Sequence, residues 1–142
     1  MKLEKIMTTQ VVTVGMDDSL QTVRMLFERF HFHHLLVLDE KARLVGVVSD
    51  RDLLKALSPF ISTLMERPQD LRTLKKRVHQ IMTRSPITAS RDLAIEKAAV
   101  LMLEEKVSCL PIVHTDRTAE GIVTNKDILK WLIQQSDWRA DA

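Results

Sequence analysis

The chain has 142 residues, of which 45% are hydrophobic and 4% aromatic, and its formal net charge is +2. This composition allows one domain or two small interlocked ones, and it excludes a disordered or fibrous chain. Near-balanced charge and few aromatic rings argue against a nucleic-acid partner. The single Cys109 rules out an internal disulfide, and no apolar run approaches the ~18 residues that cross a bilayer. We therefore expect a cytoplasmic protein with no signal peptide and no membrane partner.

The first third of the chain predicts a strand, a helix, two strands and a helix. A β-branched run at 11–14 indicates the first strand, and the polar triplet 17–19 opens a helix. That helix carries apolar residues at helical spacing, namely Leu20, Val23, Leu26, Phe27 and Phe30. Apolar runs at 35–38 and 44–48 predict two more strands. Ser49 then caps a second helix, which carries Leu53, Leu54 and Leu57.

Residues 58–77 are predicted to form a linker with a short helix. Pro59 ends the preceding helix, and Pro68 can begin another. Four apolar residues then fall on one helical face, namely Leu71, Leu74, Val78 and Ile81. The basic run 75–77 is either a nucleic-acid patch or a solvated helix face, and we favour the solvated face.

The second half of the chain repeats the first at an offset of 75 residues. Ile6-Met7-Thr8 recurs as Ile81-Met82-Thr83, and Gly46 recurs as Gly121. Aligning 6–57 with 81–132 gives 13 identities in 52 positions, where chance would give about three. The repeat predicts an α/β (α+β) fold of two β-α-β-β-α units packed pseudo-symmetrically through their small sheets. The expected domains are 1–57 and 78–135, with a tail at 136–142.

Two matched turns are the candidates for chemistry. The Ser49 turn (residues 46–52) and the Thr124 turn (residues 121–127) each run from a strand through Ser or Thr to an Asp three residues later. One interpretation is a helix cap. The other is a ligand site in which the Asp accepts hydrogen bonds from ribose hydroxyls, as in dinucleotide folds, while Arg51 or Lys126 faces phosphate. The two roles are compatible.

Taken together, these patterns resemble the CBS domain. The resemblance rests on Ile-Met-Thr, the strand Leu110-Pro111-Ile112-Val113 and the Gly-h-h-Ser/Thr-x-x-Asp turns, where h is apolar. It covers about 3–57 and 78–134. Two such domains resemble a Bateman module, as in IMP dehydrogenase and the gamma subunit of AMP-activated kinase, and the chain is similar to bacterial stand-alone pairs of the acetoin-utilisation type. The resemblance implies binding of AMP, ADP or ATP as a regulatory ligand, or of S-adenosylmethionine or NAD, with no cofactor required.

The resemblance also implies the contacts of the ligand. The ribose would meet Ser49, Asp52, Thr124 and Asp127. The purine would lie along Thr8, Thr13, Thr83 and Thr88. The phosphates would be approached by His33, His34, Ser108 and Cys109, and Pro111 stands at a position that is usually proline in the family. This chain departs from the family pattern at Leu36, which stands where the second repeat has Pro111, and at neutral Cys109, which stands opposite His34.

The asymmetry between His33-His34 and Ser108-Cys109 predicts two unlike sites. A protonated imidazole beside phosphate would make the first site favour the more phosphorylated ligand at acid pH. A metal site at 31–34 is disfavoured, because no Cys or convergent carboxylate accompanies these histidines. No catalytic nucleophile–base arrangement is evident, so we expect no enzyme activity.

The predicted function is a regulatory module that senses adenosyl nucleotides in the cleft between the repeats, signals by a change in repeat orientation, and acts on a protein partner. The alternative is a dimerisation scaffold that binds no ligand, its turns serving only as caps. A homodimer is expected because apolar helix faces exceed what one pair can bury. These faces carry Leu20, Val23, Phe27, Ile95, Ala98, Ala99 and Met102. Trp131 and Trp138 are expected to pack the last helix or a dimer contact.

Overall fold

The computed structural model describes residues 1–136 and divides them into two compact units. Unit 1 contains 1–11 together with the chain from Pro86 onward, and unit 2 contains 12–85. Trp138 and most of the predicted tail lie outside the described residues. The mixed α/β class is confirmed.

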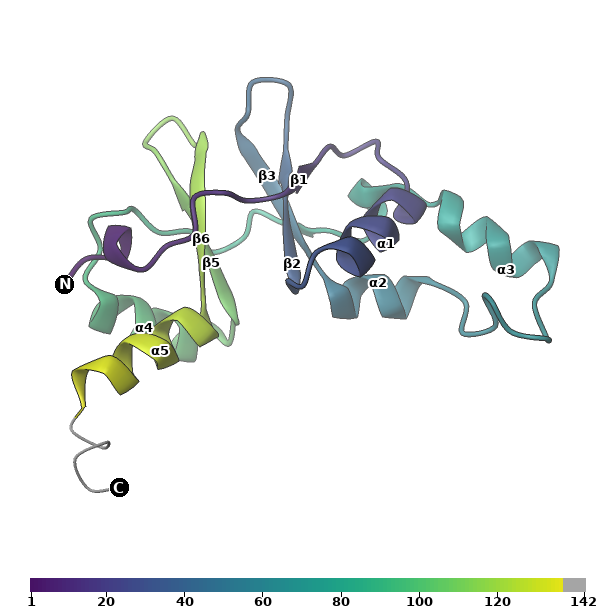
Figure 1. Cartoon of the computed structure of the whole chain (residues 1–142). Coiled ribbons are helices and arrows are strands. Elements are labelled where there is room, and N and C mark those ends of the chain that lie inside the picture. Colours follow the sequence, from purple (N-terminus) through teal and green to yellow (C-terminus); the bar gives the residue numbers. More distant parts are fainter. Residues whose placement is uncertain (137–142) are drawn as a thin grey trace. The chain divides into compact units, whose positions relative to one another are not determined.

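Unit 2 is built on a four-stranded sheet in the order β1-β2-β3-β4. Its strands are β1 (Thr13–Val14), β2 (His34–Leu38), β3 (Leu44–Ser49) and β4 (Thr83–Arg84). β1 pairs in parallel with β2, whereas β3 is antiparallel to both β2 and β4. Two helices accompany this sheet (Figure 1), namely α1 (Leu20–Arg29) and α2 (Asp50–Ala56). The predicted order of strands and helices in the first repeat is therefore confirmed, but Phe30 and Leu57 are extended residues just after the helices on which they were expected.

Unit 1 repeats this pattern with fewer regular strands. β5 (Cys109–Val113) and β6 (Ala119–Thr124) form an antiparallel pair. Isolated bridges flank the pair: Ala89 pairs in parallel with Ile112, and Thr8 pairs antiparallel with Ile122. The helices of this unit are α4 (Ile95–Glu105) and α5 (Asn125–Gln135). The strand order therefore matches unit 2, because Ala89 takes the place of β1 and Thr8 that of β4.

The first residues of each repeat pack in the unit that contains the body of the other repeat. Leu3 is fully buried in the core of unit 1, among Ile95, Leu110 and Trp131. Its repeat equivalent Val78 is fully buried in the core of unit 2. Figure 1 shows the purple N-terminal segment running beside β6, which comes from the second half of the sequence. Each unit therefore combines the body of one repeat with the first residues of the other.

Hydrogen bonds and ion pairs fix the N-terminal segment to unit 1. The Leu3 amide donates to the Leu93 carbonyl at 2.9 Å, and the Ile95 amide donates to the Met1 carbonyl at 3.0 Å. Arg91 pairs with Glu4 at 3.3 Å and with the largely buried Glu120 at 3.0 Å. Residues 1–11 thus belong to the fold of this unit.

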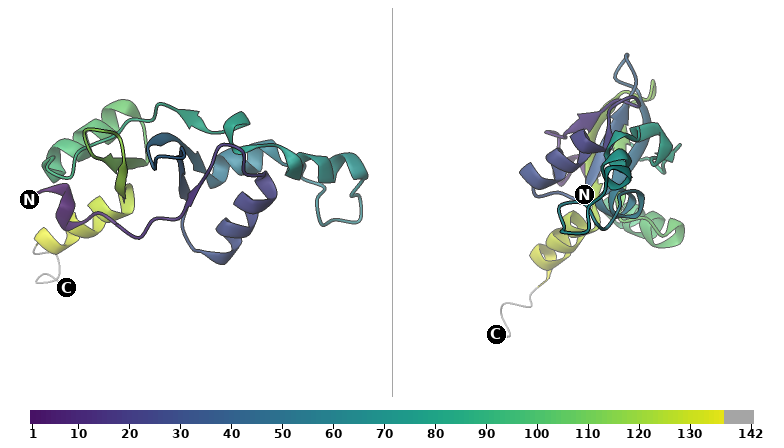
Figure 2. Two further views of the ribbon diagram at one scale, coloured as in Figure 1. Left: turned by 90° about the horizontal axis from the view of Figure 1, so that it is seen from above. Right: turned by 90° about the vertical axis from the view of Figure 1, so that its right-hand side faces the viewer.

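The linker departs from the predicted continuous helical face. α3 (Pro68–Arg72) begins at Pro68 as expected, and 3-10 turns follow at Thr73–Lys75 and Val78–Gln80. Between these turns Lys76 is extended, with ψ of 153°, so the helical register is lost. As a result Leu71 is 43% exposed whereas Val78 is buried, and the prediction of one shared face is wrong. The left view of Figure 2 shows the teal segment that contains α3 lying beyond the sheet of unit 2.

The basic run 75–77 is also not on a helix face. The Lys76 ammonium donates to the carbonyl of Ala56, the last residue of α2, at 3.1 Å. The Arg77 guanidinium donates to the Asp17 carbonyl at 3.0 Å. A cation at a helix C-terminus is stabilising. Two of the three basic residues therefore anchor the linker to unit 2.

Candidate functional site

The Ser49 turn forms a complete capping box. The Ser49 hydroxyl accepts from the Asp52 amide at 3.1 Å, and the Asp52 carboxylate accepts from the Ser49 amide at 2.9 Å. This reciprocal pair satisfies two amides that the helix would otherwise leave unbonded. The cap therefore holds Ser49 and Asp52 in a fixed geometry at the end of β3.

The Thr124 turn repeats this arrangement in unit 1. The Thr124 amide donates to Asp127 Oδ2 at 2.8 Å, and the Thr124 hydroxyl accepts from the Asp127 amide at 3.4 Å. The Thr124 hydroxyl also lies 3.1 Å from Asp127 Oδ2. The cap interpretation of both turns is thus realised in the structure. In both turns the carboxylate is partly buried and uses Oδ2 for the cap.

The exchanged segments bring threonines to these turns. In unit 2, Thr83 lies opposite Val47, two residues before Ser49. In unit 1, Thr8 lies opposite Ile122, two residues before Thr124, and the two residues exchange backbone hydrogen bonds of 2.9 Å. Thr8 and Thr83 are exposed. Each turn is therefore accompanied by a threonine from the leading segment of the other repeat.

The exchanged segments pass close to Gly46 on β3 and Gly121 on β6, and this explains why both repeats have a glycine at this position. A Cβ on Gly121 would overlap the carbonyl oxygen of Thr8, and a Cβ on Gly46 would lie 2.9 Å from the carbonyl oxygen of Thr83. Sequence reasoning used these glycines only to align the repeats. Their recurrence 75 residues apart was the available signal that another backbone segment crosses each strand.

His33 and Asp50 form a contact that the sequence did not predict. The His33 Nδ1 lies 2.7 Å from Asp50 Oδ2, and the two side chains are 56% and 40% exposed. Partial burial opposes ionisation of Asp50, but the hydrogen bond and charge of His33 outweigh it and lower the pKa of the carboxyl below 3.8. A carboxylate therefore already faces the histidine that was expected to approach phosphate.

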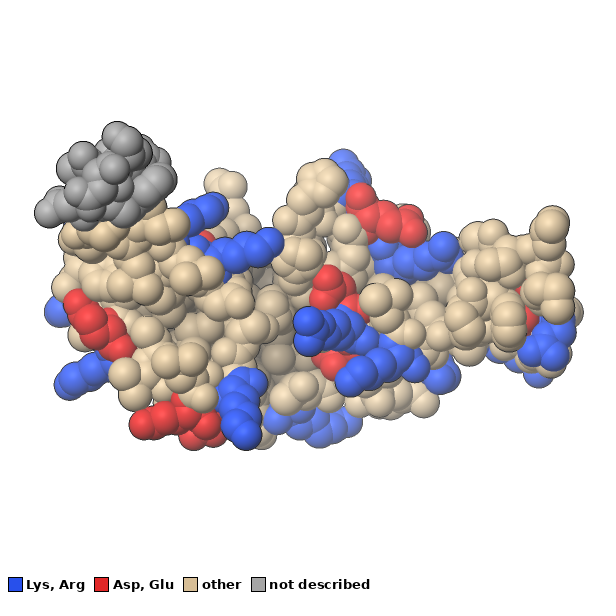
Figure 3. Space-filling model, turned by 90° about the horizontal axis from the view of Figure 1, so that it is seen from below, with Lys and Arg blue, Asp and Glu red and all other residues tan. Residues whose placement is uncertain are grey.

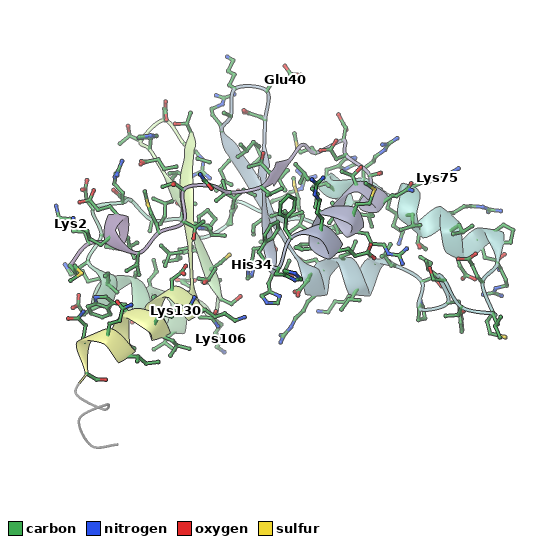
Figure 4. All side chains as sticks on the ribbon, viewed as in Figure 1. Lys2, His34, Glu40, Lys75, Lys106 and Lys130 are labelled. Carbon is green, nitrogen blue, oxygen red and sulfur yellow. The ribbon has the colours of Figure 1, made fainter. Side chains whose placement is uncertain are left out.

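His34 and Cys109 begin β2 and β5 at equivalent positions. Burial lowers the pKa of His34 below 6.5, although the nearby Asp50 opposes the shift. Burial raises the pKa of the Cys109 thiol to about 12, and this side chain is only 7% exposed. Both groups are therefore uncharged at neutral pH. Figure 4 shows His34 at the end of β2, close to the start of α2.

The remaining candidates divide between the units. Unit 2 places Thr13 on β1, opposite Leu36, and Arg51 in the first turn of α2. Unit 1 places Thr88 next to the bridging Ala89, and Lys126 in the first turn of α5. Pro111 is buried within β5, where its carbonyl accepts from the Ala89 amide at 3.0 Å. Leu36, the repeat equivalent of Pro111, is buried as well.

The described residues carry neither a clustered metal-binding set nor a bilayer-spanning helix. Within 1–136, no three or more His, Cys, Asp or Glu side chains gather so that they could hold a metal ion. In the same range, no helix combines the length and apolar character that crossing a bilayer requires. Figure 3 shows basic and acidic side chains interspersed over the face that it presents.

The repeated strand-to-helix turn and the matching element order place this protein in the class of tandem repeats of one small α/β fold. The family model for the CBS domain matches the chain twice, at residues 3–59 and 78–134. The chain therefore belongs to the CBS domain family, as the sequence motifs indicated.

Relatives of known structure cover nearly the whole chain. The CBS domain pair of protein MJ0100, solved with 5′-methylthioadenosine and S-adenosyl-L-methionine, is 26% identical with a TM-score of 0.80, and the match covers 96% of this chain and 98% of that one. The Arabidopsis thaliana CBS-pair protein CBSX2, solved in complex with AMP, is 31% identical with a TM-score of 0.78, and the match covers 94% and 96%.

A curated relative is much longer than this chain. The L-aspartate semialdehyde sulfurtransferase of Methanocaldococcus jannaschii is 29% identical over 126 residues, which are 89% of this chain but only 22% of the relative. The chain thus spans less than a quarter of this relative's length.

Proposed function

We propose that this CBS pair is a regulatory module that binds adenosyl compounds at the Ser49 and Thr124 turns. The observation that carries the proposal is the twin capping box, which fixes a hydroxyl and a partly buried carboxylate in the same geometry in each unit. Asp52 and Asp127 each use Oδ2 to accept the hydrogen bond of the cap. Their Oδ1 atoms would accept hydrogen bonds from ribose hydroxyls. The relatives bound to AMP and to S-adenosyl-L-methionine support this ligand class.

The proposed contacts follow the two units. Around the Ser49 turn they are Thr13, His33, His34, Ser49, Arg51, Asp52 and Thr83. Around the Thr124 turn they are Thr8, Thr88, Ser108, Cys109, Pro111, Thr124, Lys126 and Asp127. No cofactor is required, and AMP, ADP, ATP, S-adenosylmethionine or NAD would act as a regulatory ligand. The ligand would bias the relative orientation of the repeats and so alter the binding of a protein partner.

A thermal-shift panel tests the proposal. An adenosyl compound at ~100 times its dissociation constant stabilises the fold by about 2.7 kcal/mol, which raises the melting temperature by several degrees. Guanosine nucleotides at the same concentration are the control for unspecific nucleotide binding. If millimolar AMP, ATP, 5′-methylthioadenosine and S-adenosylmethionine all leave the melt unchanged, the proposal fails. The scaffold alternative, which the capping role of both turns already accommodates, would then stand.

We further propose that the protein forms a homodimer, on a different surface from the one that the sequence suggested. Leu20, Val23, Ile95 and Ala98 are fully buried in their own units, so their assignment to an exposed helix face is wrong. Phe27, Ala99 and Met102 also pack against these cores. Apart from Met1, the large exposed apolar residues of unit 1 in the described part of the chain lie on α4 and α5, namely Val100, Leu103, Leu129, Leu132 and Ile133, at 46% to 79% exposure.

Light scattering tests the dimer. The wild type should give twice the chain mass of 16.3 kDa at micromolar concentration. Leu103→Glu with Leu132→Glu should give the monomer, because charge on both helices opposes burial of this surface. Met25→Glu, on α1 of unit 2 and 61% exposed, is the matched control. A monomeric wild type contradicts the proposal. We place the protein in the cytoplasm and assign it no catalytic activity of its own.

A further inference from the structure

Asp50 and Asn125 occupy the same place in the two units but differ in charge. The Asp50 amide donates to the His33 carbonyl at 3.0 Å, and the Asn125 amide donates to the Ser108 carbonyl at 3.0 Å. Both residues directly follow the capping hydroxyl, of Ser49 in one unit and of Thr124 in the other. The backbone geometry is therefore matched, and the side chains account for the difference between the turns.

At neutral pH the Ser49 turn carries one formal negative charge more than the Thr124 turn. Arg51 is matched by Lys126, and Asp52 by Asp127. Asp50 has no charged equivalent, because Asn125 is neutral. The uncharged states of His34 and Cys109 do not offset this difference. A protonated His33 would cancel the charge of the Asp50 carboxylate 2.7 Å away, so the extra negative charge belongs to the state with neutral His33, and the experiment below is made at pH 8.

We propose that the Asp50–His33 pair makes the Ser49 turn select adenosyl ligands without a 5′-phosphate, such as a thioether or a cationic sulfonium, while the Thr124 turn accepts 5′-phosphates. This proposal rests on the proposed function above. A phosphate beside an ionised, partly exposed carboxylate is repelled. A neutral thioether is unaffected by this charge, and the ammonium or sulfonium group of an S-adenosyl ligand is attracted by it.

The pair also changes the expected role of His33. Its Nδ1 lies 2.7 Å from Asp50 Oδ2, so a phosphate that approaches this imidazole also approaches the carboxylate. The sequence predicted that the histidine site favours the more phosphorylated ligand, whereas this proposal gives the opposite preference, and the experiment below decides between them. The unlike sites predicted from the sequence are retained, but Asp50 is now the residue that distinguishes them.

The experiment exchanges the two residues, and each turn is isolated by disabling the other. Calorimetry at pH 8 measures the affinities for AMP and for 5′-methylthioadenosine. For the Ser49 turn, the variant Asp127→Asn, in which the Thr124 turn is disabled, is compared with the double variant Asp127→Asn with Asp50→Asn. Asp50→Asn should strengthen AMP binding about tenfold, equivalent to ~1.4 kcal/mol, and leave 5′-methylthioadenosine unchanged. On Asp52→Asn, which isolates the Thr124 turn, Asn125→Asp should weaken AMP binding about tenfold.

The outcomes separate this proposal from the proposed function. If no adenosyl compound binds the wild type, the proposed function fails and this proposal falls with it. Suppose that both ligands bind, but neither Asp50→Asn nor Asn125→Asp changes the ratio of the AMP affinity to the 5′-methylthioadenosine affinity by more than twofold. The selection by charge is then refuted, and the proposed function survives. 5′-Methylthioadenosine is the control for an intact site, because it has the same adenosine part as AMP but lacks the negative charge of the phosphate. Loss of binding of both ligands to Asp50→Asn would show that Asp50 supports the site structurally, which also refutes selection.

Discussion

Substituting Gly121 by alanine tests whether the exchanged N-terminal segment is packed against β6 as described. The new methyl group would overlap the Thr8 carbonyl oxygen, and this is a backbone atom that cannot rotate away. The segment would have to move. Two backbone hydrogen bonds of 2.9 Å between Thr8 and Ile122 would then be strained or lost.

The structure sets the size of the effect. Two backbone hydrogen bonds contribute about 1 kcal/mol each, and overpacking at a tight contact typically costs about 1–3 kcal/mol. Displacing Leu3, which is fully buried, would add about 2 kcal/mol. We expect Gly121→Ala to lower the free energy of unfolding by about 3–5 kcal/mol while Leu3 stays buried, and by about 5–7 kcal/mol if Leu3 is displaced. Either loss is a large share of an ordinary total of about 5–15 kcal/mol.

The chain supplies its own control. An alanine Cβ at Gly15 would meet only Asp18 Oδ2, at 3.8 Å, so Gly15→Ala should change stability by less than about 0.5 kcal/mol. The assay is urea unfolding followed by circular dichroism, with midpoints and slopes compared. Equal midpoints for Gly121→Ala and Gly15→Ala would refute the crossing of Thr8 over Gly121.

Three further changes test local features. Ser49→Ala and Thr124→Ala should each lower the free energy of unfolding by about 1 kcal/mol in urea titrations, because each removes one arm of a capping box; no change would contradict the cap geometry. Lys106→Gly should raise the melting temperature, since Lys106 ends α4 with φ of 56°, which glycine adopts without strain. Because the folded-state pKa of His34 lies below 6.5, the unfolded state binds more protons, and stability should fall as pH drops below about 6.5. His34→Gln should reduce this decline, and an unchanged profile would contradict the assignment.

Local features of the fold could be predicted because the residues that cause them are close in sequence. Ser19 caps α1, Ser49 and Thr124 cap α2 and α5, and Pro68 opens α3, each as its residue type requires. The repeat could be found because both turns keep the same spacing. These predictions needed no knowledge of what lies across the sheet.

The features that were missed depend on distant contacts. The apolar period of α4 correctly indicated a buried face, but it could not indicate that Ile95 and Ala98 would be covered by their own unit. The linker was predicted as one helix face because its spacing fits, whereas Lys76 is extended and its ammonium contacts the carbonyl of Ala56, 20 residues earlier in the chain. The Asp50–His33 pair joins residues 17 positions apart, and only the pairing of β2 with β3 brings them together.

The exchange of the first residues of the two repeats bears on how the protein would respond to the proposed adenosyl ligand. Leu3 completes the core of the unit that contains Thr124, and Val78 completes the core that contains Ser49. Because these segments continue into Thr8 and Thr83, a ligand that contacts Thr8 and Thr124 together would stabilise the docking of a segment from the first repeat on the body of the second. Neither repeat alone contains a complete core or a complete set of proposed contacts. On the proposed function, ligand binding at either turn would act on a junction between the two repeats, and the pair would then respond to the ligand as one protein.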